Sequence, residues 1–252
     1  MVTTYVINMD KDVERLQHMK KILSKQNIQF QRIPAVNGKE LPAQELEKYT
    51  QTARNKAWSS LGALGCFLSH RKAWENIAKA DEPWGLVLED DIYLSDSFKD
   101  YTSYESMKTC IPEDADIIRL ETSTNRLKLR NKSPFLDRNL YEVCSTSWCV
   151  GAVLIKKETA QFLLKVEKHL WDSADYFLFE KETSPTARKL KIYQLSPALA
   201  VQAKFAEENK ANHFKSNIEP EHTYKYTENS FLESLVLKVK KALEQYKRVN
   251  FQ

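Results

Sequence analysis

The apolar positions near the start of the chain follow first a strand period and then a helix period. Residues 3–8, TTYVIN, are β-branched and aromatic, which is typical of a strand. Beyond Asp10, which can cap a helix, the apolar residues fall on one helical face: Val13, Leu16, Met19 and Leu23. Residues 28–33, IQFQRI, alternate again as a strand does and lead into a turn that ends at Gly38. Strand, helix and strand in this order predict a parallel α/β unit.

Further segments repeat these two patterns along the chain. The apolar run WGLVL at residues 84–88 does not alternate, as expected for a strand that is covered on both faces. We predict further strands over residues 115–120, 150–155 and 191–195, and helices over residues 43–49, 65–79 and 156–168. The predicted fold class is therefore α/β, with a mixed, mostly parallel sheet flanked by helices.

Two polar segments follow neither period. Residues 121–139 are polar and basic, and residues 206–230 are polar and nearly free of aliphatic side chains. Loops of this length in a compact domain are usually functional or mobile. We therefore divide the chain into an α/β domain over residues 1–205, a flexible polar loop over residues 206–230 and a C-terminal segment over residues 231–252.

The C-terminal segment has the pattern of a basic amphipathic helix. Its apolar residues step by three and four: Leu232, Leu235, Val239, Ala242, Tyr246 and Val249. Lysine and arginine occupy much of the remaining surface. Such a helix can lie on an anionic membrane surface, or it can pack on the domain through its apolar stripe, and the sequence leaves both possibilities open.

Composition excludes several classes of protein. The 38 basic residues exceed the 34 acidic ones by only 4, without the concentrated basic footprint of a nucleic-acid-binding protein. No apolar run is long enough to cross a bilayer, and the start MVTTYVINMD lacks the features of a signal peptide. The four cysteines show no zinc-finger spacing, so we expect buried, reduced thiols. We expect a cytoplasmic protein, or one that is peripheral on the inner face of the cytoplasmic membrane.

Three consecutive acids, Glu89, Asp90 and Asp91, follow directly on the apolar strand in GLVLEDDIYL. In a parallel α/β sheet, ligands bind outside the carboxyl ends of the strands. Since strand side chains alternate, Glu89 and Asp91 should point to one side and Asp90 to the other. Two carboxylates on one side suit a hard cation such as Mg²⁺ or Mn²⁺, which can bind a diphosphate. The alternative is an acidic strand end that water solvates.

Further motifs stand around this cluster. The chain reads YVINMDKDVERLQHM, RIPAVNG, GALGCFLSHRKAW and GLVLEDDIYL, followed by DIIRLE, GAVLIKKETAQFLL, DYFLF and LSPALAVQ. In this ordered combination it resembles glycosyltransferase family 25, the lipooligosaccharide-biosynthesis glycosyltransferases of Gram-negative bacteria. The resemblance covers residues 2–202. It implies a GT-A-like, Rossmann-type domain and an inverting transfer of a hexose from a UDP-sugar.

The resemblance also implies roles for the residues that match the family motifs. Asp91 is expected on the metal, Glu89 on the metal or the donor ribose, and Asp90 towards the sugar or the acceptor as a catalytic residue. Asn8, at the end of the first strand, is expected near the nucleotide. Arg15 matches a second basic position and is expected among the donor-binding residues, where it could hold either Asp10 or a phosphate.

Five further positions complete the expected site. Gly65, Ser69 and His70 in GCFLSH match a donor-binding motif. A lone histidine in a helix is more often a structural hydrogen-bonding residue, but the motif favours a site role for His70. Asp175 matches a later acidic position and is expected to be the general base, with a helix cap as the alternative. His213 is a candidate third metal ligand, although the family pattern fits Ser216 better.

The function implied by the resemblance is metal-dependent hexosyl transfer. The donor would be a UDP-hexose, with galactose favoured and glucose next, the cofactor Mn²⁺ or Mg²⁺, and the acceptor a growing lipid-linked lipooligosaccharide or lipopolysaccharide glycan. The residues leave two other functions open. One is a metal-dependent hydrolase or phosphotransferase that uses the same acids, and the other is a non-catalytic carbohydrate-binding protein on the same fold.

Overall fold

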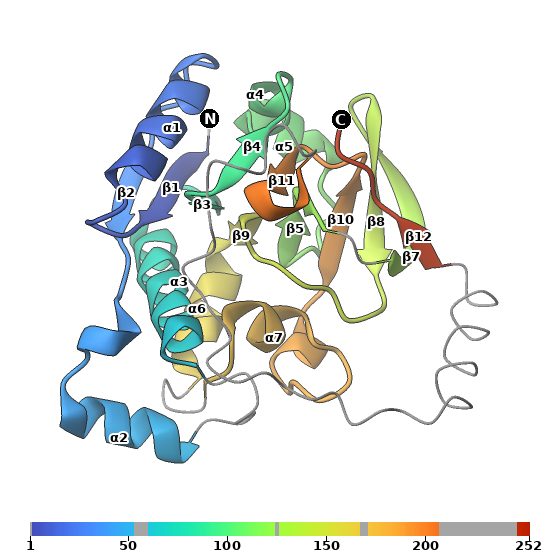
Figure 1. Ribbon diagram of the computed structural model, residues 1–252. Coiled ribbons are helices and arrows are strands. Elements are labelled where there is room, and N and C mark those ends of the chain that lie inside the picture. Colours follow the sequence, from blue (N-terminus) through green and yellow to red (C-terminus); the bar gives the residue numbers. More distant parts are fainter. Residues whose placement is uncertain (1, 53–59, 124–125, 167–170, 207–245) are drawn as a thin grey trace, which may run out of the picture.

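A computed structural model describes residues 2–52, 60–123, 126–166, 171–206 and 246–252. Over these residues the main sheet runs in the order β12–β7–β8–β10–β5–β9–β3–β1–β2 (Figure 1). Its strands are β1 (Thr3–Asn8), β2 (Gln31–Pro34), β3 (Trp84–Glu89), β5 (Ile117–Arg119), β7 (Arg126–Phe135), β8 (Arg138–Val143), β9 (Ala152–Lys156), β10 (Ile192–Ser196) and β12 (Tyr246–Arg248). A smaller sheet, in the order β4–β11–β6, contains β4 (Ile92–Leu94), β6 (Glu121–Thr122) and β11 (Ala200–Gln202).

The main sheet is mixed, as predicted. Strand β1 pairs in parallel with β2 and β3, and β5 pairs in parallel with β10. Strand β9 is antiparallel to both β3 and β5, so it separates two groups of strands that run in the same direction. The carboxyl ends of β1, β2 and β3 therefore meet at one edge, where the acidic cluster lies.

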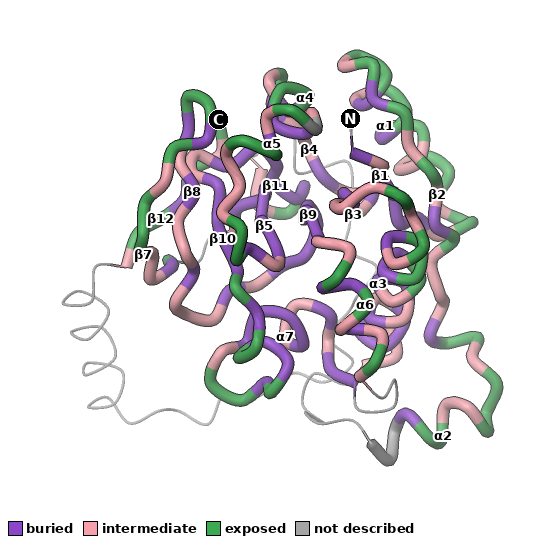
Figure 2. Tube along the Cα trace, turned by 180° about the vertical axis from the view of Figure 1, so that it is seen from behind, coloured by how far each residue is buried: buried purple, intermediate pink, exposed green. Residues whose placement is uncertain are grey.

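Helices cover both faces of the sheet, which explains the unbroken apolar runs in its strands. They are α1 (Val13–Ser24), α2 (Ala43–Thr52), α3 (Leu61–Lys79), α4 (Phe98–Tyr101), α5 (Tyr104–Cys110), α6 (Lys157–Lys165) and α7 (Ala174–Phe179). Helices α3, α6 and α7 pack on one face and α1, α4 and α5 on the other. Side chains alternate between these two cores: Val87 faces the α3 side, whereas Leu86 and Leu88 face the α1 side. Figure 2 shows the resulting buried centre of the sheet.

The predicted elements agree closely with the observed ones. Helix α3 begins four residues earlier than predicted. Its apolar period begins clearly at Gly65, but the helix begins at Leu61, because the Ser60 hydroxyl caps it by accepting a hydrogen bond from the amide of Ala63 at 3.1 Å. No helix among the described residues is long and apolar enough to cross a membrane.

Two segments differ from the sequence-based expectation. Residues 121–139, which showed no clear period, contain strand β6 and the hairpin of β7 and β8, whose register shifts between Arg130 and Ser133. The shift breaks the strict alternation that would have revealed a strand. At the C-terminus, where a helix was expected over residues 231–252, Tyr246–Arg248 forms the edge strand β12 against β7. Residues 207–245, which include the polar loop and most of that helix, lie outside the described residues.

Candidate active site

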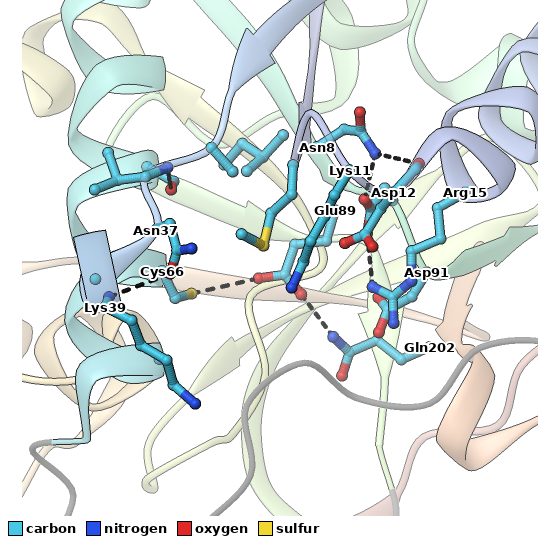
Figure 3. A pocket seen from close by; sticks show the side chains of 18 of the residues that line it. Asn8, Lys11, Asp12, Arg15, Asn37, Lys39, Cys66, Glu89, Asp91 and Gln202 are labelled. Atoms are coloured by element: carbon cyan, nitrogen blue, oxygen red, sulfur yellow. Dashed lines mark hydrogen bonds and ion pairs between the residues drawn. The ribbon is translucent and has the colours of Figure 1, made fainter.

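A pocket of about 210 Å³ opens at the carboxyl ends of β1 and β3 (Figure 3). Its walls come from the start of α1, the loop after β2, the first turns of α3 and the segment that follows β11. Six of the predicted site residues line it: Asn8, Arg15, Ser69, Glu89, Asp90 and Asp91. The expected edge of the sheet is thus where these side chains meet.

Asp90 points towards β1 and α1. Its carboxylate accepts a hydrogen bond from the Asn8 amide at 2.7 Å and pairs with the Arg15 guanidinium at 2.9 Å. Burial nevertheless outweighs these two partners and raises the pKa of Asp90 above its ordinary value. Both carboxylate oxygens are therefore already engaged by the protein. This arrangement positions Asn8 and Arg15, and a role for Asp90 at the sugar or acceptor stays a prediction.

Glu89 points to the opposite side, towards α3, as the alternation of a strand requires. One carboxylate oxygen lies 3.2 Å from His70 Nε2 and 3.7 Å from Cys66 Sγ, and the other accepts a hydrogen bond from the Gln202 amide at 2.6 Å. Burial opposes ionisation of Glu89, but the hydrogen bond and attraction of His70 outweigh it and lower the pKa of this carboxyl. Glu89 is thus held as a carboxylate.

Asp91 has the least compensated carboxylate of the cluster. Its Oδ1 is buried and has no hydrogen-bond partner among the described residues. Burial, followed by the neighbouring charge of Glu89, raises the pKa of Asp91 to about 7. A buried carboxylate oxygen without a partner is costly, and a second carboxylate beside it increases the local negative charge. Asp91 and Glu89 together therefore fit a hard divalent cation.

Positive side chains also line this pocket. Lys11, Arg15, Lys39 and Lys204 all contribute to its walls. The amide of Ala203 donates to the backbone oxygen of Asp91 at 2.7 Å, which brings the next residue, Lys204, to the acids. Burial opposes the charge on Lys204, but neighbouring groups that include Glu89 and Asp91 outweigh it and raise the pKa of the ammonium. The pocket can therefore receive an anion and a metal ion together.

Gly65 and Ser69 shape the pocket through the loop after β2. A β-carbon on Gly65 would meet the carbonyl oxygen of Val36 at 2.5 Å, so only glycine lets α3 approach this loop so closely. The Ser69 hydroxyl accepts a hydrogen bond from the Val36 amide at 2.8 Å and donates one to the Gly65 carbonyl at 2.6 Å. Gly65 lies in the second turn of α3, not at its first residue, so the amides at the helix start are those of residues 61–64. A direct donor contact by these residues stays a prediction.

Two other predicted residues, His70 and Asp175, do not line this pocket. His70 is completely buried and touches the site through Glu89. Asp175 accepts hydrogen bonds from the backbone amides of Cys149 at 3.2 Å and Tyr176 at 2.9 Å, the second within the first turn of α7. Asp175 is the second residue of α7, whose N-cap is Ser173, and the general-base role stays a prediction. His213 lies outside the described residues.

The pocket-lining residues that were not singled out from the sequence include Cys66, Gln202 and Lys204. Cys66 lies four residues before His70 on α3, and this spacing could have indicated a shared helix face. Gln202 ends the motif LSPALAVQ and reaches Glu89 across 113 positions of sequence. No local pattern distinguishes Lys204 from the other lysines of the chain, so only the fold reveals its place.

Comparison with known proteins gives a consistent result. Residues 1–178 match the model of the family described as glycosyltransferase family 25 (LPS biosynthesis protein). Over 211 residues the chain is 25% identical to the lipooligosaccharide biosynthesis protein lic2B of Haemophilus influenzae, covering 80% of this chain and 76% of that one. It is 24% identical over 221 residues to the lacto-N-neotetraose biosynthesis glycosyltransferase LgtE of Neisseria gonorrhoeae, covering 81% and 77%.

One relative from an animal and one solved structure extend the comparison. The chain is 28% identical over 172 residues to procollagen galactosyltransferase 1 of Danio rerio, which covers 65% of this chain and 28% of that protein. A solved glycosyltransferase involved in the glycosylation of the major capsid of PBCV-1 superposes with a TM-score of 0.43 and 10% identity, over 80% of this chain and 91% of that one.

Proposed function

This chain belongs to glycosyltransferase family 25, and from that premise we propose that it transfers a hexose from a UDP-sugar to a growing lipooligosaccharide or lipopolysaccharide glycan. Galactose is the favoured hexose and glucose the next. The relatives named for lipooligosaccharide and lacto-N-neotetraose biosynthesis support this acceptor class, and the procollagen galactosyltransferase supports galactose. A lipid-linked acceptor would bring the protein to the inner face of the cytoplasmic membrane as a peripheral protein.

The observation that carries the proposal is the pairing of acids and cations in one pocket. Glu89 and Asp91 form a donor set for Mn²⁺ or Mg²⁺, and Lys11, Lys39 and Lys204 line the same space. A nucleoside diphosphate needs both kinds of group, because a divalent cation binds its oxygens and lysines neutralise the remaining charge. A simple acidic strand end in water would not be enclosed in this way.

Each residue then has a role in the transfer. Asp91 and Glu89 would hold the cation, which when bound neutralises charge that develops on the UDP leaving group. Asn8 and Arg15 are fixed by Asp90 and would position the nucleotide. Lys204 would bind a phosphate oxygen of the donor.

Inversion requires a base on the acceptor side. The acceptor hydroxyl attacks the anomeric carbon from the face opposite to UDP, and its proton passes to the base as the new bond forms. We keep Asp175 as the candidate for this base. Burial, then the charge of Glu89 and then that of Asp175 raise the pKa of the Cys66 thiol, which lines the pocket, and this contribution supports a place for Asp175 near the site.

The test is a UDP-release screen on the purified protein. UDP-galactose, UDP-glucose and the N-acetylated UDP-sugars are each offered with a lipooligosaccharide acceptor extract, with Mn²⁺ and with a chelator. We expect acceptor-dependent UDP release with one UDP-hexose and Mn²⁺, and loss of that release in Asp91→Asn. Asp100→Asn is the matched control, because Asp100 is exposed on α4 and does not line the pocket.

Several results would contradict the proposal. Neither UDP release nor UDP-sugar binding with any donor would refute the transferase function. Phosphate release from simple esters without sugar transfer would point to the hydrolase alternative. Full activity of Asp91→Asn would refute the metal assignment alone.

A further inference from the structure

Cys66, His70 and Glu89 form a second possible donor set, which only partly overlaps the two carboxylates discussed above. One ligand atom from each residue lies within 4.8 Å of the other two. Cys66 and His70 are four residues apart on α3, so they share one face of the helix. Glu89 approaches that face from the end of β3. A thiol, an imidazole and a carboxylate are the three groups that most often bind Zn²⁺ in proteins.

The separations already resemble those of a tetrahedral zinc site. Bond lengths of about 2.0–2.3 Å and tetrahedral angles place nitrogen and oxygen ligands about 3.4 Å apart, and sulfur and oxygen ligands about 3.6 Å apart. The structure has His70 Nε2 at 3.2 Å and Cys66 Sγ at 3.7 Å from the same oxygen of Glu89. Closing the thiol–imidazole distance, at most 4.8 Å, to about 3.6 Å requires a shift of about 1 Å, within reach of a cysteine rotamer change.

The surrounding charge favours a cation at this position. The carboxylates of Glu89 and Asp91 line the same pocket as the Cys66 thiol, and Glu89 lies 3.7 Å from its sulfur. These carboxylates oppose a thiolate, but they attract a cation, which in turn stabilises the thiolate. The local negative charge therefore favours a cation beside the thiol.

The site is rigid on one side and open on the other. His70 is fully buried and Glu89 is anchored by Gln202, so neither ligand has to be ordered when an ion arrives. Cys66 and Glu89 both line the pocket, as Figure 3 shows. Three protein ligands with an open fourth position leave room for water or a phosphate oxygen.

We propose that Cys66, His70 and Glu89 bind a thiophilic divalent cation, foremost Zn²⁺, at a site that shares only Glu89 with the carboxylate pair that would hold Mn²⁺ or Mg²⁺. Binding converts the Cys66 thiol to a thiolate, and its proton leaves to solvent. Because Glu89 belongs to both sets, the bound Zn²⁺ withdraws it from the Mn²⁺ site and lowers transfer. This last consequence rests on the proposed function, whereas the binding does not.

The binding test uses Co²⁺ as a spectroscopic substitute for Zn²⁺. The full chain is stripped with a chelator and titrated with Co²⁺, and the near-ultraviolet thiolate-to-cobalt absorption band is followed. We expect one band per chain, bleached by one equivalent of Zn²⁺. Cys66→Ser should abolish the band, and Cys110→Ser, on α5 and away from the pocket, should retain it.

The imidazole ligand has its own variant. His70→Ala should weaken Co²⁺ binding by more than the roughly 10–100-fold that loss of a supporting group costs a metal site. Circular dichroism shows whether each variant is folded, and serine replaces cysteine almost without change in volume. A wild-type protein without a thiolate band, or an unchanged band in a folded Cys66→Ser protein, would overturn the proposal.

The transfer assay separates this proposal from the one above. Zn²⁺ added to the Mn²⁺-supported reaction should lower UDP release in the wild type, and less so in Cys66→Ser, each relative to its own zinc-free rate. A protein that shows the cobalt band but no transfer refutes the proposed function and supports the zinc site. A protein that transfers hexose but shows no cobalt band supports the proposed function and refutes the zinc site.

Discussion

Replacement of Asp91 by asparagine should raise the stability of the metal-free protein while it removes activity. The wild-type carboxylate is buried, its Oδ1 has no partner among the described residues, and it lies beside the charge of Glu89. Asparagine has nearly the same volume and no charge. The substitution therefore relieves a cost of folding that a bound cation would otherwise offset.

The magnitude follows from the pKa of Asp91, which rises from 3.8 to about 7 on folding. A carboxyl whose pKa is raised in the folded state destabilises the fold once pH exceeds the unfolded value, and the cost grows until pH passes the folded value. At 0.59 kcal/mol for RT, the wild-type penalty is about 2 kcal/mol at pH 5 and at most about 4 kcal/mol at pH 8. The variant should be more stable by these amounts.

The assay is urea unfolding in the presence of a chelator, followed by tryptophan fluorescence, at pH 5 and at pH 8. The difference in unfolding free energy between Asp91→Asn and wild type should be positive and larger at pH 8. Asp100→Asn should show neither effect, because that side chain is exposed. A variant that is less stable than wild type at pH 8, or a difference that does not change with pH, would refute the reasoning.

Three further predictions concern neighbouring contacts. Arg15→Met removes the cation that pairs with the buried Asp90 carboxylate at 2.9 Å. The free energy of unfolding measured with urea should fall by about 3 kcal/mol, because the buried carboxylate then lacks an opposite charge; an unchanged value would contradict this. Gly65→Ala should weaken UDP-sugar binding measured by calorimetry, because the loop carbonyl 2.5 Å from the new β-carbon must move; unchanged affinity would show that the loop does not shape the donor site. Gln202→Ala removes the 2.6 Å hydrogen bond that orients Glu89, and the Mn²⁺ concentration for half-maximal activity should rise about 10–100-fold. Gln202→Glu is the comparison, because it has neither the amide donor nor the neutral charge of glutamine.

Much of the fold is encoded in local patterns. The unbroken apolar run of β3 predicted a strand covered on both faces, and helices do cover both faces. Alternation separated Asp90 from Glu89 and Asp91, and the structure has Asp90 on the α1 side and Glu89 on the α3 side. These inferences succeed because periodicity and burial act between residues that are close in sequence. The hairpin of β7 and β8 was missed because its bulge and polar composition break that periodicity.

The sequence by itself determined the α/β class, the family, and an acidic cluster at the carboxyl end of a buried strand. Only the tertiary structure decided how the three acids differ: Asp90 is engaged by Asn8 and Arg15, Glu89 by partners on α3 and β11, and Asp91 keeps an unpartnered oxygen. The physical reason is that the charge state and partners of a carboxylate depend on groups brought close by strand order and loop approach. The Gln202 amide, 113 positions away, is such a group, and no local pattern specifies it.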